Sequence, residues 1–187
     1  QTAIRRRSVE RKVPVDALYM AFHMCNRFHA EYHVFDIITD LLSNGRSSRF
    51  IQTLVQEKKL FTSINAYISG SLDEGLLHIT GKPASGITLE QAEEAVWQEL
   101  DKLKTIPVAE EELEKVKNRY ESEQIFNNIN YLNVATNLAF FELLGHAEDI
   151  NLEVGKYRSV TVGQIQDTAC RTFVPENCNI LYYKAIK

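Results

Sequence analysis

The sequence predicts an α+β fold, a two-layer sandwich in which helices pack on one face of a largely antiparallel sheet. Three observations support this prediction. Apolar residues alternate with period two in stretches near the beginning, the middle and the end of the chain. Between these stretches, apolar residues recur at helical spacing. Two strand-like stretches follow each other across a short turn, which is typical of an antiparallel hairpin. The sheet face without helices is then free to meet a partner or a substrate.

The chain begins with a short basic segment, residues 1–12. We predict that it is a solvated lead-in from an upstream domain, and that residues 13–187 form a single domain. The segment is too short for a nucleic-acid-binding arm and has no aromatic residue among its cations. These cations are Arg5, Arg6, Arg7, Arg11 and Lys12.

Residues 13–24 are predicted to form the first strand, with apolar side chains on both of its faces. This pattern indicates a central strand that is either covered on both sides or faces a large internal chamber, and the sequence leaves both alternatives open. A helix is expected over residues 31–43. Its inward side chains are Val34, Phe35, Ile37, Ile38, Leu41 and Leu42.

The next stretch, residues 40–83, is predicted to contain a helix end, a tight loop, a second helix and a strand hairpin. Asn44-Gly45 can take the left-handed conformation that ends a helix, and Ser47 or Ser48 can cap the next one. That second helix has an apolar face of Phe50, Ile51, Leu54 and Val55. From Thr62 the period drops to two, which places Ser63, Asn65 and Tyr67 on the face opposite Ile64, Ala66 and Ile68. Residues 70–75 turn the chain into a returning strand over residues 76–80.

The second half of the chain is predicted to be mainly helical. A capping box at Thr88 begins one helix, which Pro107 ends, and three glutamates from residue 110 begin the next. A break across residues 127–130 precedes a helix that Gly145 ends. Thr161 caps a last helix through Arg171, and residues 179–185 form the closing strand.

Four features of residues 40–83 carry a family resemblance. They are the small-residue loop before Ser47-Ser48-Arg49-Phe50, the helix ending in Gln56-Glu57-Lys58-Lys59-Leu60, the strand from Phe61, and the acidic turn Asp73-Glu74-Gly75. The chain resembles the C-terminal, non-zinc-binding domain of pitrilysin/insulinase-family zinc metallopeptidases, which include the mitochondrial processing peptidases. The resemblance covers nearly all 187 residues in length and element order.

The resemblance implies a function and partners. Family members hold zinc in a preceding N-terminal domain through two histidines and a glutamate, and the glutamate of an HxxEH motif activates the metal-bound water. The C-terminal domain closes a clamshell-like chamber over unfolded peptide. The implied partners are an N-terminal catalytic domain of the same protein or of a partner subunit, and a peptide substrate; two chains can also pair as a dimer. Zinc then belongs to the parent protein, and this chain binds none.

The same resemblance defines the substrate-binding candidates. The family domain can supply an arginine and a tyrosine, seven residues apart, that orient the substrate. These positions fall on Val55 and Thr62, so neither side chain matches. Lys58 or Lys59 are weaker candidates for the missing cation, and solvent exposure at a helix end is the simpler interpretation of both.

No catalytic or metal-binding constellation is found in the chain itself. HxxEH, HExxH, GxSxG and a phosphate-binding glycine loop are all missing from the sequence. His29 and His33 have the spacing of a zinc pair, but Glu31 between them lies about 200° around the helix from His29 and cannot act on a shared water. We expect exposed histidines at a helix start.

Composition excludes several other classes of protein. The net charge of −4 offers no broad basic surface for nucleic acid. Three cysteines without a CxxC pair argue against a disulfide framework, although a Cys170–Cys178 bridge stays open. No run reaches the roughly 18 apolar residues of a membrane span, and no targeting segment is seen, so we expect a soluble chain. The missing initiator methionine indicates a fragment of a longer polypeptide.

Three functions follow from these observations. The first is a structural, substrate-enclosing domain of a zinc metallopeptidase that acts on unfolded peptides and is inert by itself. An extended peptide can add to an edge of the predicted hairpin at residues 61–83. The second is a non-catalytic partner or core-type assembly subunit of the same family, favoured by the altered pair Val55 and Thr62. The third is an unrelated ligand-binding α+β domain.

Overall fold

Five strands form one sheet in the computed structural model, which describes residues 1–186. The strand order is β1-β5-β2-β4-β3, and all neighbours are antiparallel except β1 and β5, which are parallel. The largely antiparallel α+β sandwich predicted from the sequence is therefore confirmed. The strands are β1 Arg5–Arg11, β2 Ala17–Met24, β3 Phe61–Ile68, β4 Gly75–Pro83 and β5 Cys178–Ala185.

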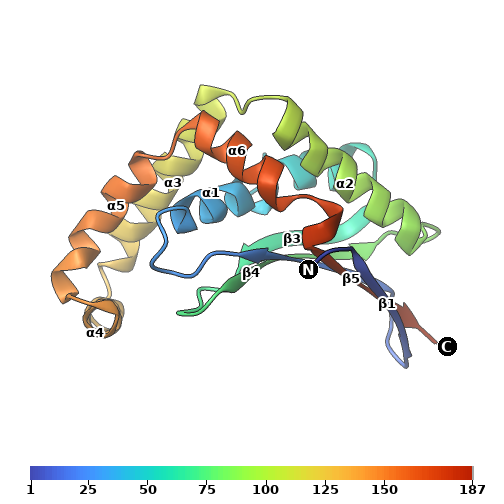
Figure 1. Cartoon of the computed structure of the whole chain (residues 1–187), viewed down its shortest axis with the longest axis horizontal. Helices are drawn as coiled ribbons and strands as arrows, with labels where there is room; N and C mark the ends of the chain where they lie inside the picture. Colours follow the sequence, from blue (N-terminus) through green and yellow to red (C-terminus); the bar gives the residue numbers. More distant parts are fainter. Residues whose placement is uncertain (187) are drawn as a thin grey trace.

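The helices lie on one side of this sheet, and the opposite face is uncovered (Figure 1). Helix α4 lies at the far end of this layer, away from the sheet (Figure 1). The helical elements are α1 Tyr32–Ser43, η1 Phe50–Glu57, α2 Leu89–Thr105, α3 Glu110–Asn127, α4 Tyr131–Leu144, η2 Ala147–Asp149, α5 Ile150–Arg158, α6 Val162–Thr172 and η3 Pro175–Asn177.

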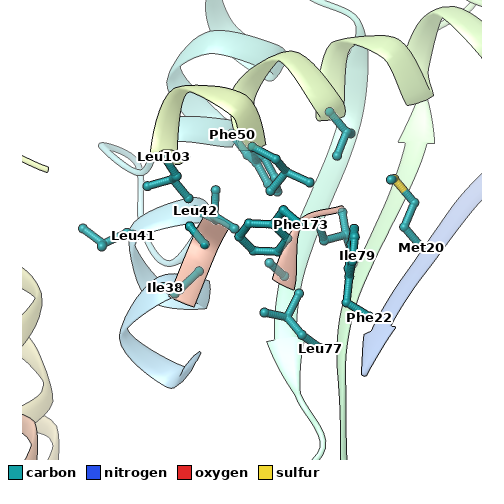
Figure 2. Close-up of a cluster of buried hydrophobic side chains, with 14 of the residues drawn as sticks. Met20, Phe22, Ile38, Leu41, Leu42, Phe50, Leu77, Ile79, Leu103 and Phe173 are labelled. Carbon is teal, nitrogen blue, oxygen red and sulfur yellow. The ribbon is translucent and has the colours of Figure 1, made fainter. Parts of the chain in front are cut away.

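The core lies between the helices and the inner face of the sheet. Strand β2 is central, and its alternate residues from Leu18 to Met24 point to the helices and are buried. Its other face carries Tyr19, which is 41% exposed, so β2 is covered on one side only. Figure 2 shows how side chains from β2, β4, α1 and α2 meet in this core, together with Phe173 from just beyond α6.

Residues 1–12 do not form the predicted solvated lead-in. Arg5–Arg11 form β1, which pairs in parallel with β5 from Arg5 opposite Asn179 to Arg11 opposite Ala185. Arg6 points to the helix layer, where its guanidinium lies 2.6 Å from Glu93 of α2. Long-range pairing with the last strand thus orders a segment whose local sequence is almost entirely polar. Its charged side chains suit a sheet edge, because they discourage further strand pairing.

Most predicted helix ends are confirmed by the backbone. Thr88 and Thr161 each form a capping box, and Gly45 has a φ of +95°, the left-handed conformation expected after α1. The serine caps are wrong, because η1 is a π-helix that follows Arg49 and has no side-chain cap. The Ser48 hydroxyl instead donates to the Gly45 carbonyl at 2.7 Å.

Two further features complete the fold. All three cysteines are free thiols, so the Cys170–Cys178 bridge left open by the sequence does not form. Within residues 1–186, the helices all fall short of the length and apolar character that crossing a membrane would require.

Candidate functional site

The uncovered face of the sheet, called the open face below, presents side chains from all five strands. Successive residues of a strand point to opposite faces, so the register assigns each strand residue to the helix layer or to the open face. Tyr19 and Tyr67 are the large exposed aromatic residues there, at 41% and 45% exposure. The open face consists of Arg5, Arg7, Val9, Arg11, Ala17, Tyr19, Ala21, His23, Ser63, Asn65, Tyr67, Leu76, His78, Thr80, Lys82, Asn179, Leu181 and Tyr183.

The register lines these side chains up in rows that cross the sheet. One row runs Asn65, Thr80, Tyr19, Leu181 and Arg7, in which each residue lies opposite the next. A parallel row runs from Tyr67 through His78 to Arg5. The rings of Tyr67 and His78 stack with centroids 5.0 Å apart. The open face is therefore ordered by cross-strand contacts of its own.

A hollow of about 340 Å³ lies on the open face over β2, β4 and β3. Tyr19, Tyr67 and Lys82 contribute its large side chains, and shorter residues such as Ser63 and Thr80 lie among them. Gly81 opposes Leu18 in the same region, and the Phe61 ring fills the space beneath that glycine on the helix side. Short side chains between long ones thus create a concave site with hydroxyl and ammonium donors.

The charge of the open face is uniformly positive. Its cations are Lys82 on β4 and the arginines 5, 7 and 11 on β1, and within residues 1–186 no aspartate or glutamate of a strand points to this face. Burial lowers the pKa of His78, which favours the neutral form of this ring. Several carboxylates of the helix layer pair with cations, among them Glu93, Glu112 and Glu153.

The residues predicted to bind substrate do not gather at one site. Val55 is half-buried in η1 and packs against the core. Thr62 is exposed at a β-bulge, and its hydroxyl donates to the Lys82 carbonyl at 3.1 Å. Lys58 and Lys59 are both exposed, as expected, and the Lys58 ammonium lies 3.4 Å from Gln98 of α2. Only Thr62 therefore lies beside the open face.

Sequence reasoning missed the residues that line the hollow. The alternation that places Tyr67 outward is visible in the sequence, and so is the alternation of Tyr19 in β2. Local patterns do not reveal that β2 and β4 are neighbours, and this pairing places Tyr19 opposite Thr80. Lys82 lies at the end of β4, beyond the returning strand expected from the alternation.

The histidines near the start of α1 serve different purposes. His29 is exposed, as predicted, whereas the prediction is wrong for His33, which is buried with Nε2 3.3 Å from a Glu153 carboxylate oxygen. Arg27 also pairs with Glu153, at 2.7 Å, while Glu31 pairs with Arg171. This cluster joins α5 to α1. In residues 1–186, no three histidine, cysteine or acidic side chains are arranged to hold a metal ion.

A second uncovered surface lies on the helices far from the hollow. Helix α4 has apolar residues on every side, with Asn133, Asn137 and Glu142 among them, and Phe141 is its only buried residue. We call the exposed large apolar residues of α4 and its neighbours the α4 surface. It comprises Ile125, Phe126, Ile129, Tyr131, Leu132, Leu138, Phe140, Leu143 and Leu152, which are 40% to 89% exposed. Exposed apolar residues gathered on neighbouring elements are typical of an interaction site.

Comparison with known proteins connects these surfaces to a family. Residues 2–120 match the family model described as the peptidase M16 inactive domain. No curated protein sequence matches the chain. Among solved structures, a protease from Helicobacter pylori superposes with a TM-score of 0.92 at 19% identity over 98% of this chain and 45% of its own.

Two further structures show how widely this fold is used. The inactive peptidase domain of a candidate zinc protease from Bordetella parapertussis has a TM-score of 0.84 at 18% identity, and the match covers 96% of this chain and 97% of that one. A chain of complex III2 from Candida albicans has a TM-score of 0.79 at 16% identity, and the match covers 95% of this chain and 45% of that one. The chain thus spans under half of the Helicobacter and Candida chains and nearly all of the Bordetella one.

Proposed function

Because the chain belongs to the peptidase M16 inactive-domain family, we propose that it is the substrate-enclosing C-terminal domain of a zinc metallopeptidase acting on unfolded peptides. The uncovered sheet face is the observation that carries this proposal. Five strands present a broad surface with exposed tyrosines and a hollow, on the side of the sheet that no helix covers (Figure 1). Closing a second domain over this face would create an enclosed chamber. We propose that residues 13–187 belong to this single domain and that β1 is part of it.

The catalytic zinc in this proposal belongs to another domain. The chain lacks an HxxEH motif, and His33 and Glu31 are held by Glu153 and Arg171. When bound in the partner domain, zinc would supply an activated water for attack on a peptide carbonyl. The contribution of this chain is to bind and orient the peptide through its open face.

The α4 surface supports packing against that second domain, in the same protein or in a partner subunit. Its large apolar residues are exposed in this chain, and burying them against another domain would release water and stabilise the assembly. The α4 surface belongs to the helix layer, so a partner packed there leaves the open face accessible to substrate (Figure 1).

The open face is a better peptide site than the edge of the hairpin. Strand β3 is an edge strand, as the edge-addition hypothesis requires. However, the Ser43 hydroxyl at the end of α1 accepts from the Ala66 amide at 2.8 Å and lies 3.1 Å from the Ala66 carbonyl. An added peptide strand would have to displace this side chain.

A second function is supported by the substrate-binding pair. Val55 and Thr62 replace the arginine and tyrosine that the family resemblance implies, and Val55 packs against the core and makes no contact with the open face. This loss favours a non-catalytic partner or assembly subunit. A similarly folded chain occurs in complex III2 of Candida albicans.

Joining this chain to a zinc-binding half tests the two functions. We expect the zinc-loaded assembly to cleave an unfolded casein-like peptide, and we expect this chain alone to have no activity. The control is the same assembly with the HxxEH glutamate of the other half replaced by glutamine. An assembly that forms and binds zinc but cleaves no unfolded peptide would contradict the first function and favour the assembly subunit.

A further inference from the structure

We propose that the open face selects acidic peptide segments, and that the hollow beside Lys82 binds a carboxylate side chain of such a segment. The inference rests on the proposed peptide-binding function and adds the class of substrate. Neither Val55 nor Thr62 provides a cation, so Lys82 supplies the charged contact from a neighbouring strand.

The donors around the hollow match a carboxylate. Lys82 lines the hollow with an ammonium side chain that has three donors, and Tyr19 and Tyr67, each with a hydroxyl donor, line the same hollow. A carboxylate accepts several hydrogen bonds at once, and those from a charged donor are the strongest. The Thr62 hydroxyl bonds the Lys82 carbonyl, which holds the backbone of this residue at the bulge.

The cations of the open face are unpaired, unlike most arginines of the helix layer. In the helix layer, arginines 6, 27, 49, 158 and 171 each contact a glutamate. Within residues 1–186, Lys82 and the arginines 5, 7 and 11 form no ion pair with an acidic side chain. A bound anionic chain would therefore not have to displace an existing partner.

Charge complementarity also orients the ligand. The whole chain carries a net charge of −4, yet its open face carries only cations. An acidic peptide is repelled by the helix layer and attracted to the opposite side, which raises its local concentration where the hollow lies. A basic peptide is instead repelled by the open face and attracted to the helix layer.

The strand order predicts a spacing between acidic residues. Three strand intervals separate β4 from β1, so Lys82 and Arg7 lie about 15 Å apart at about 4.8 Å per strand. An extended peptide covers this distance in about four to five residues. A segment with acidic side chains at that spacing can contact Lys82 and Arg7 together.

The test uses three fluorescent unstructured peptides that differ only at two positions four residues apart, which carry Glu, Gln or Lys. The Bordetella domain, which this chain matches almost end to end, is a precedent for studying the domain by itself. We expect the Glu peptide to bind about tenfold tighter than the Gln peptide at low salt, since one charge-assisted contact has about that effect. High salt should remove most of this preference.

Variants assign the preference to the hollow. Lys82→Gln should abolish most of the tenfold preference and leave binding of the Gln peptide unchanged, whereas Lys82→Arg should keep it. Lys115→Gln is the matched control, because Lys115 is exposed on α3 in the helix layer. Unchanged unfolding midpoints would show that each variant is folded.

The possible outcomes separate the inference from the function on which it rests. Equal binding of all three peptides, or a Lys82→Gln variant that weakens them all equally, would overturn the acidic preference and leave peptide binding intact. Failure of every peptide to bind would contradict peptide binding itself. Tighter binding of a single-stranded oligonucleotide of the same charge, lost in Lys82→Gln, would show that the face recognises phosphate and would overturn the peptide assignment.

Discussion

At the scale of single residues, Ser43 shows how one hydroxyl completes a sheet edge. Its oxygen accepts from the Ala66 amide at 2.8 Å and donates either to the Asn65 side chain at 2.9 Å or to the Ala66 carbonyl. An edge strand leaves every second amide without a partner in the sheet. Ser43, the last residue of α1, accepts a hydrogen bond from one such amide of β3. The contact joins α1 to β3.

Replacing Ser43 with alanine should therefore destabilise the protein. The change leaves the Ala66 amide unpaired at a buried position, which costs about 1–3 kcal/mol in the free energy of unfolding. Urea denaturation measures this quantity. Ser63→Ala is the matched control on the exposed face of the same strand and should change stability by less than about 0.5 kcal/mol. Equal stability of the two variants would show that solvent satisfies Ala66 equally well.

Residue patterns also explain which parts of the site were predictable. The alternation of Ser63, Asn65 and Tyr67 placed these side chains on one face of β3, and the structure confirms it. The position of Tyr19 opposite Thr80 depends on the pairing of β2 with β4, which joins segments about 60 residues apart. Local spacing does not encode such pairing, so the hollow itself was beyond sequence reasoning.

At the scale of elements, β1 and α5 were missed for related reasons. Strand β1 has only one apolar side chain, Val9, and it is ordered by pairing with β5. Helix α5 contains Gly155, and its buried side chains are Glu153 and Tyr157, so it has no apolar stripe to identify it. Polar contacts hold it, including the Tyr157 hydroxyl on Asp36. Elements held by polar or long-range contacts lack the periodicity that identified the others.

Helix α4 differs because its apolar residues are spread over every side of the helix. Its composition is that expected of a buried helix, yet Phe141 is the only residue of α4 that is buried in this chain. The surroundings that would bury the rest of the α4 surface must come from another domain or subunit, or from self-association. The exposed residues of α4 should therefore matter for assembly and very little for the fold of this chain.

The double variant Leu132→Ser and Leu143→Ser tests this expectation. These side chains are 73% and 76% exposed, so the free energy of unfolding should change by less than about 0.5 kcal/mol. Self-association measured by sedimentation should fall, and affinity for the zinc-binding half should drop about tenfold or more. Leu72→Ser with Ile106→Ser, at 48% and 57% exposure elsewhere, is the matched control. Equal effects of the two double variants would contradict a specific interface on α4.

At the scale of the whole molecule, charge is divided between the two faces. Some buried carboxylates in the helix layer are held by cations, as Glu153 is by Arg27 and Lys156. The open face keeps its cations free of such pairs. The buried carboxyls themselves are of two kinds, because some are paired with cations and others are not. The protein therefore has two opposing responses to acid.

Glu153 and Asp40 represent these two responses. Burial alone would raise the pKa of Glu153, but hydrogen bonds from His33 and Lys156 and the charge of Arg27 outweigh it and lower the pKa from 4.5 to about 2. Burial raises the pKa of Asp40 from 3.8 to about 6, and its hydrogen bond from Asn44 does not offset this. Burial also raises the pKa of Asp36, so this carboxyl contributes to the pH dependence in the same direction as Asp40.

Stability should consequently pass through a maximum near pH 4–5. Between pH 6 and 4 the folded state binds more protons at Asp40 than the unfolded state does, so acidification stabilises the fold. Below about pH 4.5 Glu153 becomes protonated in the unfolded state but stays ionised in the folded state, so acidification destabilises the fold. About 3 kcal/mol is then lost as the pH falls through 2, at about 1.4 kcal/mol per pKa unit.

Urea denaturation from pH 7 to pH 3 measures this profile. Asp40→Asn should flatten the limb above pH 4 and raise stability at pH 7, by up to about 3 kcal/mol at about 1.4 kcal/mol per pKa unit. Glu153→Gln should flatten the acid limb but lower stability at pH 7 by about 3 kcal/mol, because it leaves Arg27 buried without its anion. Glu94→Gln, an exposed change on α2, is the control and should leave the profile unchanged. A profile that declines steadily from pH 7, with the same slope in Asp40→Asn, would contradict the assignment of the upper limb to this carboxyl.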